Sequence, residues 1–150
     1  MVTNRLKSDE EGWTLVELAL TLSLIGLLVS LAVPAFVQWG DRLERELFLG
    51  GLAEDLRLAQ REARLTEEKT VLQLDEKRQT YTVKKGRRTL RREAIPPRYK
   101  LTSNYPGNRV TFRPTGQVRG GTFRLVVGST QAGRVIVQVA SGRPKVEVDP

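Results

Sequence analysis

The segment Gly12-Trp13-Thr14-Leu15-Val16-Glu17 opens an apolar run that continues to Gly40. Between Leu18 and Gly40 the chain contains no Asp, Glu, Lys or Arg. A helix needs about 20 apolar residues to cross the hydrocarbon core of a bilayer, and this run is long enough. The sequence therefore predicts a transmembrane and assembly helix over residues 13–39, preceded by a short polar head over residues 1–12.

Glu17 is a carboxylate at the leading edge of this predicted span. Ionisable groups in apolar spans are costly, and they usually have a paired, functional role. A cut after Gly12 would leave the apolar run in the chain, whereas a secretory signal peptide is cut after its apolar stretch. The pattern indicates a processed, membrane-inserted assembly subunit. A carboxylate that reaches the membrane interface without a partner is the alternative.

Pro34 lies well inside the apolar run, and Gly26 and Ser30 form a pair of small residues that permits close helix approach. Proline removes a backbone hydrogen bond and crowds the preceding turn, so we expect a kink or local melting over residues 30–34. Neighbouring helices could cover that break. A plain membrane anchor with an incidental proline is the other interpretation.

Helical periodicity continues beyond the span and then gives way to strands. Apolar residues at spacings of three and four predict a helix that ends between Thr66 and Lys69, with a stripe of Phe48, Leu52, Leu56, Ala59 and Ala63. Alternating segments predict strands over residues 70–74, 80–84, 87–92, 99–102, 109–113, 122–127, 134–139 and 145–148. Turns are expected at Gly86, Pro114-Thr115-Gly116, Gly120-Gly121 and Ala132-Gly133.

These elements predict an α+β fold: a long N-terminal helix, transmembrane and then amphipathic, packed on a small antiparallel β-sheet domain. The predicted domain organisation has three parts, namely a head over residues 1–12, a membrane helix over 13–39 and a soluble α+β domain over 40–150. The last part is large enough for one small core.

The composition excludes several kinds of chemistry. The 150 residues include neither Cys nor His, so the usual zinc ligands and the commonest general base are missing. A Ser-His-Asp triad cannot be built, and no phosphate-binding glycine motif is present. We therefore expect a protein that is not an enzyme, with no metal and no cofactor. An enzyme that uses Lys, Ser or paired carboxylates is the remaining catalytic alternative, and no motif supports it.

The chain carries 25 Lys and Arg against 17 Asp and Glu, a net charge of +8. Such an excess favours anionic partners such as nucleic acid or lipid headgroups. A dense cluster surrounds one predicted hairpin and consists of Lys84, Lys85, Arg87, Arg88, Arg91 and Arg92. Cations of this kind bind nucleic-acid phosphates through counterion release, whereas a solvated charged face is the alternative.

The N-terminal segment Gly12-Trp13-Thr14-Leu15-Val16-Glu17-Leu18, with Gly26 and Ala32-Val33-Pro34-Ala35-Phe36, resembles the type IV prepilins and pseudopilins. The resemblance implies that a prepilin peptidase cleaves between Gly12 and Trp13 and that Trp13 is then methylated. Trp13 stands where Phe is more common, and Asp9-Glu10-Glu11 stands where basic residues are common.

The same resemblance implies roles for two residues of the helix. Glu17 would pair with a freed amino terminus and guide subunit register during assembly. Pro34 would loosen the helix so that subunits fit together in a filament.

The downstream half is similar to minor pseudopilins of the GspH/FimT type, on residues 109–116, 121–123 and 142–146. This implies a structural subunit of a type IV pilus, a type II secretion pseudopilus or a DNA-uptake pilus. The implied partners are the prepilin peptidase, other pilins or pseudopilins in a filament, the inner-membrane assembly platform with its ATPase, and membrane lipid. The implied location is a single pass in the cytoplasmic (inner) membrane with the C-terminal domain outside the cytoplasm, and then the pilus or pseudopilus.

DNA is a further candidate partner. Some proteins of the GspH/FimT type bind DNA through a C-terminal loop that contains Gly-Arg, and Gly142-Arg143-Pro144-Lys145 is similar. The resemblance implies that Arg143 and Lys145 contact DNA phosphates. A membrane-tethered DNA-binding module that acts in DNA uptake (competence) is therefore the alternative function.

Overall fold

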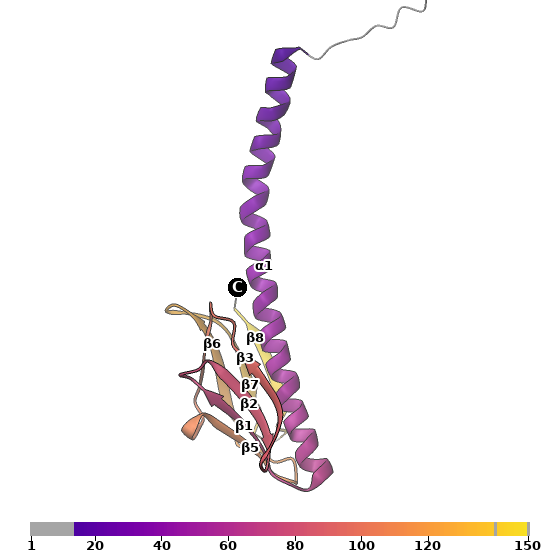
Figure 1. The fold of residues 1–150 in the computed structure, drawn as a ribbon, viewed down its shortest axis with the longest axis vertical. Coiled ribbons are helices and arrows are strands. Elements are labelled where there is room, and N and C mark those ends of the chain that lie inside the picture. Colours follow the sequence, from indigo (N-terminus) through magenta and orange to yellow (C-terminus); the bar gives the residue numbers. More distant parts are fainter. Residues whose placement is uncertain (1–13, 140, 150) are drawn as a thin grey trace, which may run out of the picture. The chain divides into compact units, whose positions relative to one another are not determined.

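The computed structural model describes residues 14–139 and 141–149. Two compact units meet between Gly40 and Asp41. Helix α1 (Leu15–Thr66) passes through both units, and the strands all follow it in the chain (Figure 1). The prediction that the helix continues past the apolar run is confirmed, and it ends at Thr66.

Helix α1 is continuous through Pro34, so the local melting expected over residues 30–34 is absent from this conformation. Pro34 has no N–H, which leaves the Ser30 carbonyl without its usual helical donor. The Ser30 hydroxyl donates to the Leu27 carbonyl at 2.7 Å. The helix therefore accommodates the proline without the hydrogen bond that a backbone N–H at position 34 would donate.

Eight strands follow the helix in the described residues, and a short 3₁₀ turn, η1 (Pro106–Asn108), lies among them. The strands are β1 (Thr70–Asp75), β2 (Thr80–Lys85), β3 (Arg88–Ala94), β4 (Lys100–Ser103), β5 (Arg109–Phe112), β6 (Gly121–Val127), β7 (Thr130–Val137) and β8 (Pro144–Val148). They form two four-stranded antiparallel sheets, β3-β2-β1-β5 and β4-β6-β7-β8. The α+β fold class is confirmed, and the structure adds that the strands divide between two sheets.

The two sheets are linked by an exchange of strands. The chain leaves the first sheet after β3, forms β4 at the edge of the second, and returns through η1 to place β5 at the edge of the first. In chain order, β4 of the second sheet therefore comes between β3 and β5 of the first. Likewise, β5 of the first sheet comes between β4 and β6 of the second. This crossing makes one core from the two sheets and the helix.

The predicted apolar stripe of α1 is confirmed, since Leu52, Leu56, Ala59 and Ala63 are buried and Phe48 packs against the core. Strand β1 alternates between buried and half-buried residues, as expected for a sheet with one face on the core. The largest fully buried side chains come from α1 and from both sheets, and include Leu49, Leu72, Val83, Phe112, Phe123 and Leu125.

The turn predicted at Ala132-Gly133 is wrong. These residues lie within β7, and the chain reverses at Gly128 and Ser129 instead. Gly133 is needed for packing, because a Cβ there would lie 2.5 Å from Leu49 Cδ1 and 2.9 Å from the Glu147 carbonyl oxygen. The glycine permits close approach of helix and strand, and sequence alone does not separate that role from a turn.

One carboxylate, Asp55 of α1, is buried against the first sheet, with 1% of its surface exposed. Tyr81 Oη donates to Asp55 Oδ2 at 2.7 Å, and Arg91 Nε lies 3.2 Å from Asp55 Oδ1 as an ion pair. Burial raises the pKa of Asp55, although the Tyr81 hydrogen bond and the Arg91 charge oppose the shift. This network ties α1 to β2 and β3.

Candidate functional site

The described part of the first unit is a helical segment whose apolar side chains are uncovered. Its large apolar side chains from Leu15 to Trp39 are between 51% and 83% exposed. By length and composition this segment could span a membrane. Exposed apolar surface of this extent marks a membrane or protein contact.

Glu17 lies in the first turn of α1. Its backbone N–H donates to Thr14 Oγ1 at 3.2 Å, so Thr14 is the N-cap of the helix. A carboxylate in the first turn is favoured by the helix dipole. Within residues 14–139 and 141–149, no ion pair involves the Glu17 side chain.

Sequence reasoning missed the Thr14 cap, although the Thr-x-x-Glu spacing of a capping box signalled it. Gly12 and Trp13, the residues of the predicted cleavage and methylation, lie outside the described residues. Glu17 and Pro34 belong to the first unit, and Arg143 and Lys145 belong to the second.

The two cations predicted to contact DNA lie at the junction of the last loop and β8, with Arg143 in the loop and Lys145 on the strand; we call residues 141–145 the C-terminal turn. Gly142 has a φ of 65° and donates its N–H to the Gln138 carbonyl at 2.9 Å. Lys145 Nζ lies 3.0 Å from Glu147 Oε1, and Arg134 Nε lies 2.6 Å from Glu147 Oε2. The Lys145 and Arg134 contacts hold the pKa of Glu147 below its usual range.

Arg143 and Lys145 are therefore not equivalent. Arg143 is exposed and has no ion pair among the described residues, whereas Lys145 is paired with Glu147, a carboxylate that it shares with Arg134. If this turn binds an anion, Arg143 is the better of the two cations.

Gln60 of α1 fixes this turn, and sequence reasoning missed it. Gln60 Nε2 donates to the Gly116 carbonyl at 3.0 Å and to the Ser141 carbonyl at 2.9 Å. A Cβ at Gly142 would lie 2.4 Å from Gln60 Nε2. One polar side chain beside the apolar stripe thus joins the loop after β5 to the loop before β8, and periodicity gives no signal for it.

The basic cluster at the β2–β3 hairpin is confirmed around Gly86, which has a φ of 54°. Its members are exposed except for the half-buried Lys85, and Arg91 is engaged by Asp55 and Glu93. Strand β3 is an edge of its sheet, and the register shifts between Val83 and Lys84. Charges and bulges of this kind protect an exposed edge from pairing with other chains.

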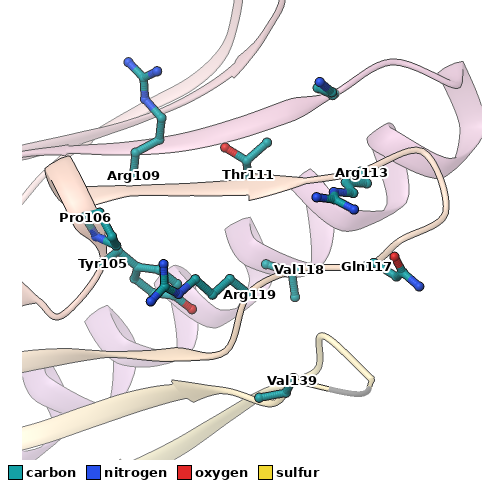
Figure 2. Close-up of a pocket in the computed structure, with 10 residues that line it drawn as sticks. Tyr105, Pro106, Arg109, Thr111, Arg113, Gln117, Val118, Arg119 and Val139 are labelled. Carbon is teal, nitrogen blue, oxygen red and sulfur yellow. The ribbon is translucent and has the colours of Figure 1, made fainter.

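A second basic feature is a cavity of about 750 Å³ beside strand β5. We call it the basic pocket, and it is lined by Lys69, Tyr105, Pro106, Arg109, Thr111, Arg113, Gln117, Val118, Arg119 and Val139 (Figure 2). Four of these residues are cations and none is a carboxylate. Sequence reasoning did not group the four cations, since Lys69 comes from the loop before β1, Arg109 from β5, and Arg113 and Arg119 from the loop after β5.

Comparison with known proteins identifies the family to which the second unit is similar. Residues 50–142 match the family described as type II transport protein GspH. No curated protein sequence matches the chain.

Solved structures share the fold at low sequence identity. A minor pseudopilin, EpsH, from the type II secretion system of Vibrio cholerae has a TM-score of 0.60 at 13% identity, over 73% of this chain and 96% of that chain. A second EpsH structure has a TM-score of 0.57 at 16% identity, over 70% of this chain and 97% of that one. The type IV minor pilin FimU of Pseudomonas aeruginosa has a TM-score of 0.58 at 14% identity, over 75% and 92%.

Proposed function

The chain belongs to the GspH family of type II transport proteins, and we propose that it is a minor pilin or pseudopilin. In this role it is a structural subunit rather than an enzyme. The observation that carries the proposal is a GspH-type domain continuous in sequence with a helical segment of uncovered apolar side chains. Burial of apolar surface is worth about 25 cal/mol per Å², so this segment requires lipid or other apolar helices around it. A filament subunit is surrounded first by lipid, in the membrane, and then by the apolar helices of other subunits, in the filament.

In this proposal the prepilin peptidase removes residues 1–12 and Trp13 becomes the methylated amino terminus. That amino group would stand one residue before the Thr14 cap, at the same end of α1 as Glu17. An amino group and a carboxylate from adjacent subunits can pair there, which offsets the cost of placing either charge in apolar surroundings. Pro34, which donates no helical hydrogen bond, lets the segment bend as helices pack.

The remaining partners follow from the same role. Before assembly the subunit is inserted in the cytoplasmic membrane with its C-terminal domain outside the cytoplasm. An inner-membrane platform with its ATPase supplies the energy that extracts the subunit from the membrane. The filament is a type II secretion pseudopilus, a type IV pilus or a DNA-uptake pilus.

Intact mass and N-terminal analysis of the membrane-extracted protein test the proposal. We expect a chain that begins at methylated Trp13 when the peptidase is present and at Met1 when it is absent. Glu17→Ala should be cleaved normally but enter filaments poorly, because one charge of the pair is then left alone. Glu68→Ala, which removes an exposed carboxylate after the helix, is the matched control. An uncut chain in both strains would contradict processing, and normal filament entry of Glu17→Ala would contradict the pairing.

DNA binding is the second candidate function, and the exposed, unpaired Arg143 favours it. We expect a labelled duplex to bind the full chain in non-ionic detergent with an affinity that falls as salt rises, because phosphate binding releases counterions. Arg143→Gln should weaken binding more than Lys145→Gln, since Lys145 is paired with Glu147. Equal weakening by the two variants would contradict the predicted difference between the two cations. Unchanged binding in both variants, or no binding at low salt, would exclude the C-terminal turn as a DNA site.

A further inference from the structure

We propose that the basic pocket binds an extended acidic peptide segment, with Arg113, Arg119 and Tyr105 holding its carboxylates. The pocket lies entirely in the second unit and requires nothing of the membrane helix. Its failure to bind would therefore leave the filament role untouched.

The first argument is the charge of the pocket. Lys69, Arg109, Arg113 and Arg119 line it, and no ion pair engages any of them among the described residues. Some cations elsewhere in the same domain have carboxylate partners, as Arg134 and Lys145 have Glu147, whereas others, such as Arg88 and Arg124, are exposed and have none among the described residues. Arginine favours carboxylates because its planar guanidinium can donate two parallel hydrogen bonds. The pocket therefore collects cations that lack an anion from their own chain.

The second argument is the hydroxyl group of Tyr105. This side chain is only 5% exposed, lines the pocket, and has no hydrogen-bond partner for its hydroxyl oxygen within residues 14–139 and 141–149. Buried polar groups are nearly always paired, so an unpaired one at a pocket wall points to a missing partner. Burial raises the pKa of Tyr105 to about 12, so the hydroxyl stays protonated and can donate.

Arg119 lies at the same place. Figure 2 shows the Tyr105 hydroxyl beside the Arg119 side chain, and the charge of Arg119 acts on the pKa of Tyr105. A neutral hydroxyl donor next to a guanidinium matches one carboxylate group. Arg113, at the other end of the pocket, offers a second position for a carboxylate.

The third argument is the strand that forms one wall. Strand β5 is the edge of its sheet, and within the described residues no strand pairs with its outer side. An extended peptide can add to such an edge through main-chain hydrogen bonds. Because side chains alternate along strands, every second residue of that peptide would face the same way. A segment with acidic residues at alternate positions fits this wall.

Single-stranded nucleic acid fits the domain less well. Proteins that bind it combine cations with aromatic rings on which bases stack. From Phe48 to Phe123, every aromatic side chain of the domain is buried or half-buried. The pocket offers hydrogen-bond donors that suit a carboxylate, and it has no exposed aromatic ring on which a base could stack.

Fluorescence anisotropy with the full chain in non-ionic detergent tests the proposal. The probe is a labelled peptide of alternating Glu and Thr of about eight residues, a common strand length. Its control replaces each Glu with Gln. The pocket variants are Arg113→Gln with Arg119→Gln, and separately Tyr105→Phe. The matched variant is Arg88→Gln with Arg124→Gln, two exposed arginines on β3 and β6 without ion pairs among the described residues.

We expect the acidic peptide to bind and the Gln peptide not to bind. Each pocket variant should weaken binding about tenfold or more, since a lost charge-assisted bond has that effect. The matched variant should change binding less than about twofold, because exposed distant charges are screened. Thermal unfolding by circular dichroism checks that each variant is folded, and Tyr105→Phe keeps the packing of the ring.

Several results would overturn the proposal. One is that the acidic peptide does not bind, and another is that the matched variant weakens binding as much as the pocket variants. Unchanged binding by Tyr105→Phe would remove the donor role. A labelled DNA duplex that binds only when Arg113 and Arg119 are present, while the peptide fails, would assign the pocket to nucleic acid instead. Aggregation of the arginine variant without any peptide binding by the parent would show that the cations only protect the β5 edge.

Discussion

Asp55 shows how one residue can fix the helix to the sheet. Its carboxylate is buried, and its hydrogen bond comes from Tyr81 of β2. Tyr81→Phe removes that donor, so we expect the free energy of unfolding to fall by about 1–3 kcal/mol. Urea unfolding in detergent measures it. Tyr105→Phe is the matched control, because the Tyr105 hydroxyl has no partner in the part of the domain that the structure describes, and its removal should cost little. Equal losses in both variants would show that the Asp55 contact contributes nothing.

The pKa of Asp55 predicts a pH dependence. Burial raises this pKa above the ordinary value of 3.8, so the folded protein binds a proton more readily than the unfolded chain does. The contribution of Asp55 to stability is therefore greatest at low pH and is lost as pH rises through the raised pKa. Asp55→Asn removes this titration. From about pH 7 to about pH 4, stability relative to Asp55→Asn should shift in favour of the parent protein. Parallel pH profiles of the two melting temperatures would exclude the shift.

At the scale of elements, the contact between α1 and β7 depends on Gly133. A Cβ at this position would meet Leu49 Cδ1 at 2.5 Å and backbone oxygen of Glu147 at 2.9 Å. Gly133→Ala should therefore cost about 1–3 kcal/mol of stability through overpacking. Gly50→Ala is the opposite case, since nothing lies within 4 Å of its Cβ and the residue is helical. It should stabilise the domain by about 1 kcal/mol through helix propensity. Chemical denaturation compares them, and a loss in both would contradict the packing argument.

At the scale of the whole molecule, every buried residue among those that the structure describes belongs to the second unit. The first buried residue in α1 is Leu49, and the whole buried core follows it. A fragment of residues 41–150 should therefore fold in water without detergent, while the full chain needs detergent or lipid for its apolar segment. The Asp41–Arg98 ion pair at the start of the fragment would be retained. Gel filtration and circular dichroism measure this. A fragment without cooperative unfolding would show that the first unit contributes to the fold of the second.

Local patterns in the sequence predicted the helix, the strands and the family, although the turn expected at Ala132-Gly133 was wrong. The 3.6-residue period of the α1 stripe and the alternation of the strands are local patterns, so they predict helix and strands without knowledge of the tertiary fold. The segment around Gly12 and Glu17 and the uncharged run after it predict membrane insertion for the same reason. The absence of His and Cys is visible in composition alone.

Which distant residues come into contact depends on how the elements pack together, and local patterns do not predict it. The division into two sheets depends on where β4 and β5 pair, and neither strand encodes its partner in its own alternation. The Asp55–Tyr81 contact spans 26 positions, and Gln60 reaches a carbonyl 81 positions away. The basic pocket is assembled from β5, η1 and several loops that are distant in the chain, so its cations look in the sequence like ordinary surface charges. Periodicity reports the environment of a residue along one element, whereas a site is made by the packing of several elements against one another.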